Sequence, residues 1–190
     1  ENCQTFLDKI NLKSTDIIRP YDDPIGKDGT IAILKGNLAP DGAVIKHSAC
    51  PQEMMQAVLR ARPFDSEEAA IDAIIKKQIK PGDAVFIRYE GPKGSGMPEM
   101  FYTGEAISSD QELAKSIALI TDGRFSGASK GPVIGHVSPE ASEGGPIALI
   151  EENDLIKIDV PQRRLEIIGI EGKQRTSQEI TKILKERHAK

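Results

Sequence analysis

Tryptophan is absent from this 190-residue sequence, cysteine occurs twice, and aromatic residues make up only 4% of the chain. The few aromatic side chains argue against a surface on which single-stranded nucleic acid stacks. Two cysteines, Cys3 and Cys50, cannot form a framework of disulfides. We therefore expect a reduced, cytoplasmic setting for this protein.

Long apolar runs and an excess of positive charge are also missing. No apolar run approaches the about 18 residues that a helix needs to cross a bilayer, and the first ten residues lack the form of a signal peptide. The formal net charge is −4, with 25 basic and 29 acidic residues. Because a nucleic-acid-binding surface needs concentrated positive charge, we expect neither a membrane nor a nucleic acid as a partner.

The length suits one ordinary domain, and runs typical of strands outnumber those typical of helices. Turn signals such as Pro81-Gly82 separate the runs. We expect strands over residues 31–34, 43–46, 84–89, 117–121, 133–137, 147–150, 155–160 and 165–168, the last two forming a hairpin. Short strands with few helices predict a mixed α/β domain whose sheet can close into a barrel.

Capping signals predict the helices. Ser66, followed by two glutamates, is typical of a helix start, and isoleucines at positions 71, 74, 75 and 79 recur on one helical face before Pro81 ends the helix. Thr176 and Glu179 form a capping-box pattern, followed by apolar residues at positions 180, 183 and 184. A short helix over residues 5–10 is a further prediction.

One glycine-rich stretch, TDGRFSGASKGPVIGHVS at residues 121–138, presents a serine at a sharp bend. Glycines there allow positive φ angles or close approach of a ligand to the backbone around Ser126. The alternative is a tight turn in which Ser126 bonds its own backbone. The stretch lacks the G-x-S-x-G pattern, and none of the three histidines has an acidic partner nearby in sequence, so a hydrolase triad is weakly supported. His136, inside an apolar run, is more typical of a core or edge histidine than of a ligand.

Other residues are weaker candidates for binding. Glu99 follows a flexible glycine loop, and its carboxylate could supply one oxygen ligand to Mg²⁺, but the local pattern favours a solvated surface glutamate or a helix-start residue after Pro98. Lys46 ends an apolar strand and could face a carboxylate substrate, or could simply be solvated. Cys50 lacks a C-x-x-C partner and is more typical of a small buried side chain than of a metal ligand.

Together these segments resemble a known family. The stretches GNLAPDGAVIK (36–46), IKPGDAVFIRYEGPKGSGMPEM (79–100), LITDGRFSGASKGPVIGHVSPEA (119–141) and DLIKIDVPQRRLEI (154–167) are similar to the C-terminal domain of the dihydroxy-acid dehydratase and sugar-acid dehydratase family, which includes phosphogluconate and pentonate dehydratases. The resemblance implies a swivelling, barrel-like β domain with flanking helices. It also implies an enzyme that removes water from a 2,3-dihydroxy acid to give a 2-keto acid, using Mg²⁺ and an iron–sulfur cluster.

The resemblance also assigns roles to residues. Ser126 would be the base, acting as an alkoxide that takes the proton from C2, and Glu99 would be a ligand of Mg²⁺. Gly127 and Lys46 would contact the substrate. The cluster ligands would lie in an N-terminal domain of the longer protein. Residues 1–25 would then be a linker from that domain, and residues 26–190 the C-terminal domain itself. The expected partners are its own N-terminal domain, a small hydroxy-acid substrate and a second copy of the protein in a homodimer.

Two further functions stay open at this point. The chain could be a stand-alone module whose loop at residues 123–131 binds a carboxylate or phosphate without chemistry. It could also be a scaffold that mediates dimerisation through its apolar strands. The sequence does not decide between a branched dihydroxy acid and a sugar acid as substrate.

Overall fold

A nine-stranded sheet organises the chain in the computed structural model, which describes residues 3, 5, 9–10, 14–127 and 129–189. In spatial order the strands are β1 (Ala32–Leu34), β2 (Gly42–Ile45), β8 (Val133–Ser138), β6 (Ala118–Thr121), β4 (Asp83–Ile87), β3 (Gln56–Phe64), β9 (Leu155–Asp159), β10 (Arg164–Ile170) and β11 (Lys173–Gln174). The four central strands β8, β6, β4 and β3 run parallel, and the outer pairs are antiparallel. A second, two-stranded sheet pairs β5 (Glu99–Met100) with β7 (Arg124–Phe125).

The large sheet curls back on itself, so the predicted mixed α/β, barrel-like fold is confirmed. The segment that follows β1 reaches β10, where Lys35 and Arg164 form a bridge. The side chain of Asn37 adds hydrogen bonds of 2.9 and 2.7 Å to the backbone of Ile167. A Cβ atom on Gly36 would lie 2.1 Å from the carbonyl oxygen of Leu165, so only glycine permits this closure.

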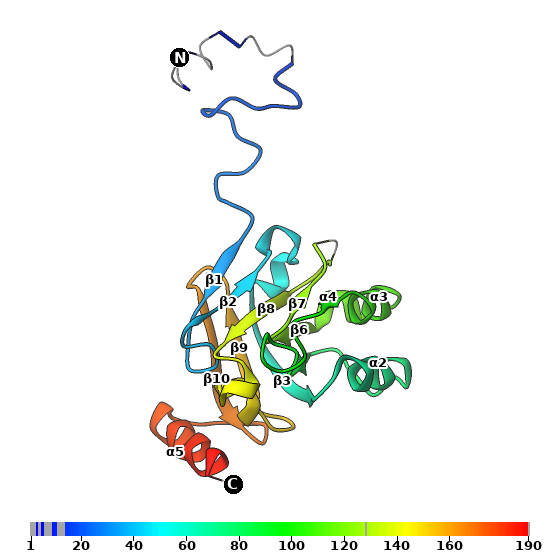
Figure 1. The fold of residues 1–190 in the computed structure, drawn as a ribbon, viewed down its shortest axis with the longest axis vertical. Coiled ribbons are helices and arrows are strands. Elements are labelled where there is room, and N and C mark those ends of the chain that lie inside the picture. Colours follow the sequence, from blue (N-terminus) through cyan, green and yellow to red (C-terminus); the bar gives the residue numbers. More distant parts are fainter. Residues whose placement is uncertain (1–2, 4, 6–8, 11–13, 128, 190) are drawn as a thin grey trace.

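Four α-helices flank the sheet in the described part of the chain: α2 (Glu67–Ile75), α3 (Tyr102–Ser108), α4 (Leu113–Ser116) and α5 (Ser177–His188). Short 3₁₀ helices cover His47–Ala49, Gln52–Met54, Ala141–Glu143 and Pro146–Leu149. Figure 1 shows α2, α3 and α4 grouped on one side of the sheet, whereas α5 lies apart from them. None of the described helices is long and apolar enough to cross a bilayer.

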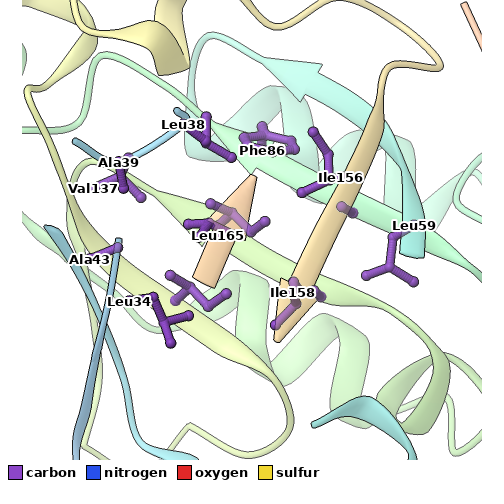
Figure 2. Close-up of a cluster of buried hydrophobic side chains, with 14 of the residues drawn as sticks. Leu34, Leu38, Ala39, Ala43, Leu59, Phe86, Val137, Ile156, Ile158 and Leu165 are labelled. Carbon is purple, nitrogen blue, oxygen red and sulfur yellow. The ribbon is translucent and has the colours of Figure 1, made fainter. Parts of the chain in front are cut away.

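Two apolar cores result from this arrangement. The first fills the inside of the curled sheet and includes Leu34, Phe86 and Ile156 (Figure 2). The second lies between the sheet and the helices α2 to α4, and it includes Val85 and Met100. Alternate residues of the buried strand β4 therefore serve different cores, because successive side chains of a strand point to opposite faces.

Several sequence-based predictions need correction. Residues 147–150 were expected to be a strand, but residues 147–149 belong to the 3₁₀ helix that starts at Pro146, because proline pre-sets a helical φ angle, and Ile150 is the extended residue that follows it. Helix α2 has the expected Ser66 cap but ends at Ile75, and its buried residues are Ala70, Ala73 and Ile74. Ile75, placed by its spacing on the same helical face as Ile74, is 69% exposed.

The C-terminal prediction is confirmed. Thr176 caps α5 with both hydrogen bonds of a capping box, and Ile180 of that helix is buried. The expected hairpin also forms, because β9 and β10 pair in antiparallel register. Local signals were sufficient here since the capping residues and the turn are all close in sequence.

The segment before β1 has no helix or strand in its described residues 14–30. Figure 1 shows this segment extending away from the sheet. Its apolar side chains are solvent-exposed, with Ile17 at 81%, Tyr21 at 101% and Ile25 at 87% exposure. The predicted linker over residues 1–25 and helix over residues 5–10 lie partly outside the described residues, and the domain boundary at residue 26 stays a prediction.

Candidate functional site

The candidate site lies where the parallel strands β4 and β6 end. These two strands pair in register from Ala84 with Ala118 to Ile87 with Thr121, so their carboxyl ends meet at one edge of the sheet. Ligands of open α/β sheets bind at this edge, where the loops that leave neighbouring strands converge. Here the segment after β4 leads to Glu99 at the start of β5, and the segment after β6 leads through β7 to Ser126.

Asp122 holds the loops of this edge together. Its side chain is buried, and its carboxylate accepts hydrogen bonds from the backbone N–H groups of Tyr89, Glu90 and Ala141 at 3.2, 3.1 and 2.8 Å. These three donors come from two different loops. Asp122 therefore fixes the start of the serine loop against its neighbours, a role that the sequence did not reveal.

Gly123 allows the serine loop to approach the loop after β4. A Cβ atom at this position would lie 2.7 Å from the carbonyl oxygen of Glu90 and 3.0 Å from the terminal methyl carbon of Met100. The contact with the backbone oxygen is shorter than real side chains tolerate, so packing favours glycine at this position. The carbonyl oxygen of Gly123 also accepts the N–H of His136 at 2.9 Å, which ties the loop to β8.

Ser126 follows β7 directly and is half-buried. Its carbonyl oxygen accepts the N–H of Ser129 at 3.0 Å, so the chain turns at this point, as predicted. Ser126 lines a cavity of about 320 Å³, here called the serine cavity. Other residues that line it are Val44, Lys46, Gly127, Ser129 and His136.

Lys46 and Gly127 also reach the serine cavity, as the sequence prediction requires. The ammonium of Lys46 donates a hydrogen bond of 3.0 Å to the carbonyl oxygen of Gly127. Among the described residues that line the cavity, Lys46 alone bears a permanent charge. The cavity therefore combines a hydroxyl with a positive charge, which suits a small anion.

Glu99 lies on the strand next to Ser126 but outside the serine cavity. Strand β5 pairs with β7 so that Glu99 faces Arg124 and Met100 faces Phe125 in register. Met100 is fully buried in the core beneath the helices, whereas Glu99 is exposed. Glu99 is absent from the described lining of the serine cavity, so the chain brings the two predicted residues to adjacent strands without joining their side chains in one cavity.

His136 differs from its predicted role as a core or edge histidine. Its side chain is exposed and lines the serine cavity. It also lines a second cavity of about 470 Å³, here called the acidic cavity, whose other residues include Asp41, Lys93, Asp122, Glu140 and Glu143. His136 thus forms part of the wall between a cationic and an acidic space.

The described residues do not fit a complete metal or cluster site. No group of three or more His, Cys, Asp or Glu side chains in the described part of the chain can hold a metal ion. Burial, aided by the charge of Glu53, raises the pKa of the Cys50 thiol to about 11, so this side chain stays protonated at neutral pH. A cluster needs thiolates, and Cys50 is a core residue, as the sequence indicated.

Comparisons with known proteins agree with this geometry. A family model described as the C-terminal part of dihydroxy-acid/6-phosphogluconate dehydratases matches residues 16–189. The dihydroxy-acid dehydratase of Clostridium novyi is 61% identical over 153 residues, which cover 80% of this chain and 27% of the relative. The dihydroxy-acid dehydratase of Methanococcoides burtonii is 53% identical over 168 residues, covering 88% of this chain and 30% of the relative.

A third relative, the dihydroxy-acid dehydratase of Agathobacter rectalis, is 58% identical over 175 residues, covering 87% of this chain and 31% of the relative. The chain therefore spans less than a third of the length of these three curated relatives. The family match covers most of the chain, including every strand of the sheet and the serine cavity. This chain belongs to the dihydroxy-acid/6-phosphogluconate dehydratase family and represents its C-terminal domain.

Proposed function

We propose that this chain is the C-terminal domain of a hydro-lyase that converts a 2,3-dihydroxy acid to a 2-keto acid. The observation that supports it most directly is the serine cavity, where Ser126 and Lys46 meet although they are 80 positions apart in sequence. A negatively charged hydroxy acid needs a cationic wall, and its dehydration needs a base. The serine cavity supplies a candidate for each.

Ser126 is proposed as the base. As an alkoxide its oxygen takes the proton from C2, the C2–H electron pair forms the C2–C3 double bond, and the C3–O bond breaks. The departing hydroxide then takes up the proton held by Ser126 and leaves as water, which restores the alkoxide. The enol that remains then gives the 2-keto acid by moving its hydroxyl proton to C3. A serine hydroxyl is a poor base unless positive charge lies nearby, and Lys46 is the cation that this chain contributes.

Mg²⁺ and an iron–sulfur cluster are proposed as cofactors of the longer protein, in line with the family resemblance. Because the described residues hold no complete metal site, Glu99 is proposed to supply a single oxygen ligand, with the others coming from outside this domain. The cluster ligands are likewise proposed to lie in an N-terminal domain. Bound Mg²⁺ would act as a Lewis acid toward substrate oxygens.

A branched dihydroxy acid is the proposed substrate, and branched-chain amino-acid biosynthesis the proposed setting. The relatives from Clostridium novyi, Methanococcoides burtonii and Agathobacter rectalis are all named dihydroxy-acid dehydratases. Their identities of 53 to 61% favour this branch over sugar-acid dehydratases. A homodimer and a cytoplasmic location stay predictions.

The test uses a full-length protein that carries this domain. Turnover is measured with 2,3-dihydroxyisovalerate and with a panel of aldonic acids, for the parent and for Ser126→Ala. We expect turnover of the branched acid by the parent and its loss in Ser126→Ala, with the content of iron and the unfolding midpoint unchanged. Ser129→Ala, which removes another hydroxyl from the same cavity, is the matched control and should keep most of the activity.

Retained turnover in Ser126→Ala would refute the role of this serine. Turnover of aldonic acids alone would refute the substrate class but leave the reaction type standing. Saturable binding of the acid by the full-length parent without any product would favour the stand-alone binding module instead.

A further inference from the structure

His136 occupies a β-bulge in the strand that forms the back of the serine cavity. Strand β8 pairs with β2 so that Gly42 faces Ser138 and Val44 faces Gly135, which leaves one extra residue on β8. His136 lies in this interval and has a φ angle of 56°. Bulges of this kind bend a strand and re-aim a side chain, and they recur next to active sites.

The bulge determines the side of the sheet on which the His136 side chain lies. In a regular strand side chains alternate, so His136 would share the core-facing side of Ile134. The extra residue instead lets Ile134 and Val137 both enter the core inside the sheet, and His136 becomes exposed on the side of the two cavities. The N–H of His136 is satisfied by the carbonyl oxygen of Gly123.

Packing within the domain gives no reason for histidine here. A left-handed φ angle is strained for a residue with a side chain, and glycine is the residue that adopts it without cost. The imidazole forms no hydrogen bond or ion pair with any residue that the structure describes. Among described residues, six other non-glycine positions have a positive φ, and all of them lie outside regular helices and strands, namely Lys77, Tyr89, Met97, Asn153, Arg163 and Glu171. Strain at a site that gains no internal contact points to a ligand.

The charges around His136 indicate what that ligand is. On one side, Lys46 brings a positive charge to the serine cavity. On the other side, four carboxylates outnumber the single cation Lys93 among the described residues of the acidic cavity, which makes it unfavourable for an anion; they are Asp41, Asp122, Glu140 and Glu143. A neutral imidazole offers one N–H donor, and a carboxylate or hydroxyl of a substrate can accept it.

We propose that His136 is a substrate-binding residue that, with Lys46, holds the carboxylate of the hydroxy acid in the serine cavity. This inference rests on the proposed function, because it names a contact of the same substrate. On this proposal, the bulge in β8 serves substrate recognition, because a strand without the bulge would direct the His136 side chain into the core.

The experiment measures binding apart from turnover. In a full-length protein carrying Ser126→Ala, the dissociation constant for 2,3-dihydroxyisovalerate is measured by calorimetry, with and without His136→Gly. Removal of a hydrogen bond to a charged group should weaken binding on the order of tenfold to a hundredfold. Because glycine relieves the strained backbone, the unfolding midpoint should stay equal or rise.

Lys77→Gly is the matched control. Lys77 has the same φ angle of 56° and lies after α2, away from the serine cavity, so it should change the midpoint similarly and leave the dissociation constant unchanged. His136→Asn serves as the second variant, since asparagine also tolerates this conformation. We expect it to bind more weakly than histidine at this position.

Unchanged binding in both His136 variants would overturn the inference while leaving the proposed function intact. A drop in the midpoint of His136→Gly with unaltered affinity would show that the histidine is structural. Failure of the Ser126→Ala parent to bind any dihydroxy acid would overturn the proposed function together with this contact.

Discussion

The ammonium of Lys46 donates a hydrogen bond to the carbonyl oxygen of Gly127 at 3.0 Å, across 81 positions of sequence. Lys46 comes directly after β2, and Gly127 comes directly after the candidate base. Both residues line the serine cavity, so the contact brings a positive charge to the cavity that also contains the proposed base. Folding, rather than any local motif, creates this neighbourhood.

Replacement of Lys46 should therefore weaken substrate binding. Lys46→Met keeps the length and apolar stem of the side chain but removes the charge. In a full-length protein we expect KM for a dihydroxy acid to rise on the order of tenfold or more, because a hydrogen bond to a charged group is lost. Steady-state kinetics at fixed ionic strength would check this.

Lys130→Met is the control for this prediction. Lys130 is exposed, follows Ser126 by four positions and does not line the serine cavity. Lys130→Met therefore changes the net charge by the same amount as Lys46→Met. An equal rise of KM in both variants would mean that overall charge, and not the position of Lys46, governs binding.

Two glycines of the serine loop should respond differently to alanine. Gly123→Ala places a Cβ atom 2.7 Å from a backbone oxygen, so we expect the chain to lose about 1 to 3 kcal/mol of unfolding free energy from the forced shift. Gly127→Ala meets nothing within 4 Å and should change stability by about 0.5 kcal/mol or less. Urea unfolding of the two variants measures both values.

Gly127→Ala, which should leave stability nearly unchanged, should instead alter the KM for substrate. If the substrate lies against Gly127, the added methyl group of Gly127→Ala raises KM although the fold is intact. An unchanged KM in Gly127→Ala would contradict its predicted substrate contact, and a normal stability of Gly123→Ala would contradict the close approach of the two loops.

Most of the sheet could be predicted from local patterns, but its longest strand could not. In β3, Leu59 and Ala61 are buried and alternate with the outward Arg60 and Arg62. Pro63 near its end lacks an N–H group and argues against a strand, yet here it pairs with Phe86 at the end of the ladder. Parallel pairing with β4 overrides the local signal, and parallel partners lie far apart in sequence.

In the candidate site, too, some residues could be predicted from local patterns and others depend on contacts between distant segments. Ser126 and Lys46 carried recognisable local patterns, and the structure brings them to one cavity. Asp122 was missed because its function is to accept backbone donors from other loops, which no sequence pattern records. His136 was assigned to a core or edge position because the bulge that turns it outward depends on pairing with β2.

The C-terminal helix depends on one buried ion pair. Arg187 donates to both carboxylate oxygens of the fully buried Asp154 at 2.5 and 3.1 Å, and also to the carbonyl oxygen of Leu149. Burial alone would lower the pKa of Arg187, but the hydrogen bond and charge of Asp154, helped by Glu151, raise it on balance. Arg187 therefore stays charged in the folded protein.

Arg187→Met should destabilise the chain by about 3 to 5 kcal/mol, because it leaves the carboxylate of Asp154 buried with a backbone N–H donor from Glu151 but without its cationic partner. Urea unfolding at neutral pH measures this loss. Lys182→Met on the same helix removes an exposed pair with Glu186, whose nitrogen and oxygen are 3.9 Å apart, and should cost about 0.5 kcal/mol or less. Similar losses in the two variants would show that the buried pair has no special weight.

The last prediction concerns the reactivity of Cys50. Burial and the charge of Glu53 raise the pKa of this thiol from 9.0 to about 11, so at pH 8 the folded chain holds far less reactive thiolate than the unfolded chain. In a Cys3→Ser variant, which leaves Cys50 as the single thiol, labelling by a disulfide reagent should be on the order of a hundredfold slower in buffer than in denaturing urea.

The same shift predicts how stability depends on pH. Below about pH 9 the thiol is neutral in both states and adds no pH dependence. Between about pH 9 and 11 the unfolded chain releases a proton that the folded chain retains, so this group lowers the unfolding free energy as pH rises through that window. Cys50→Ala should remove this part of the slope. Fast labelling of the folded protein, or an identical slope without Cys50, would contradict the burial of this side chain in the core.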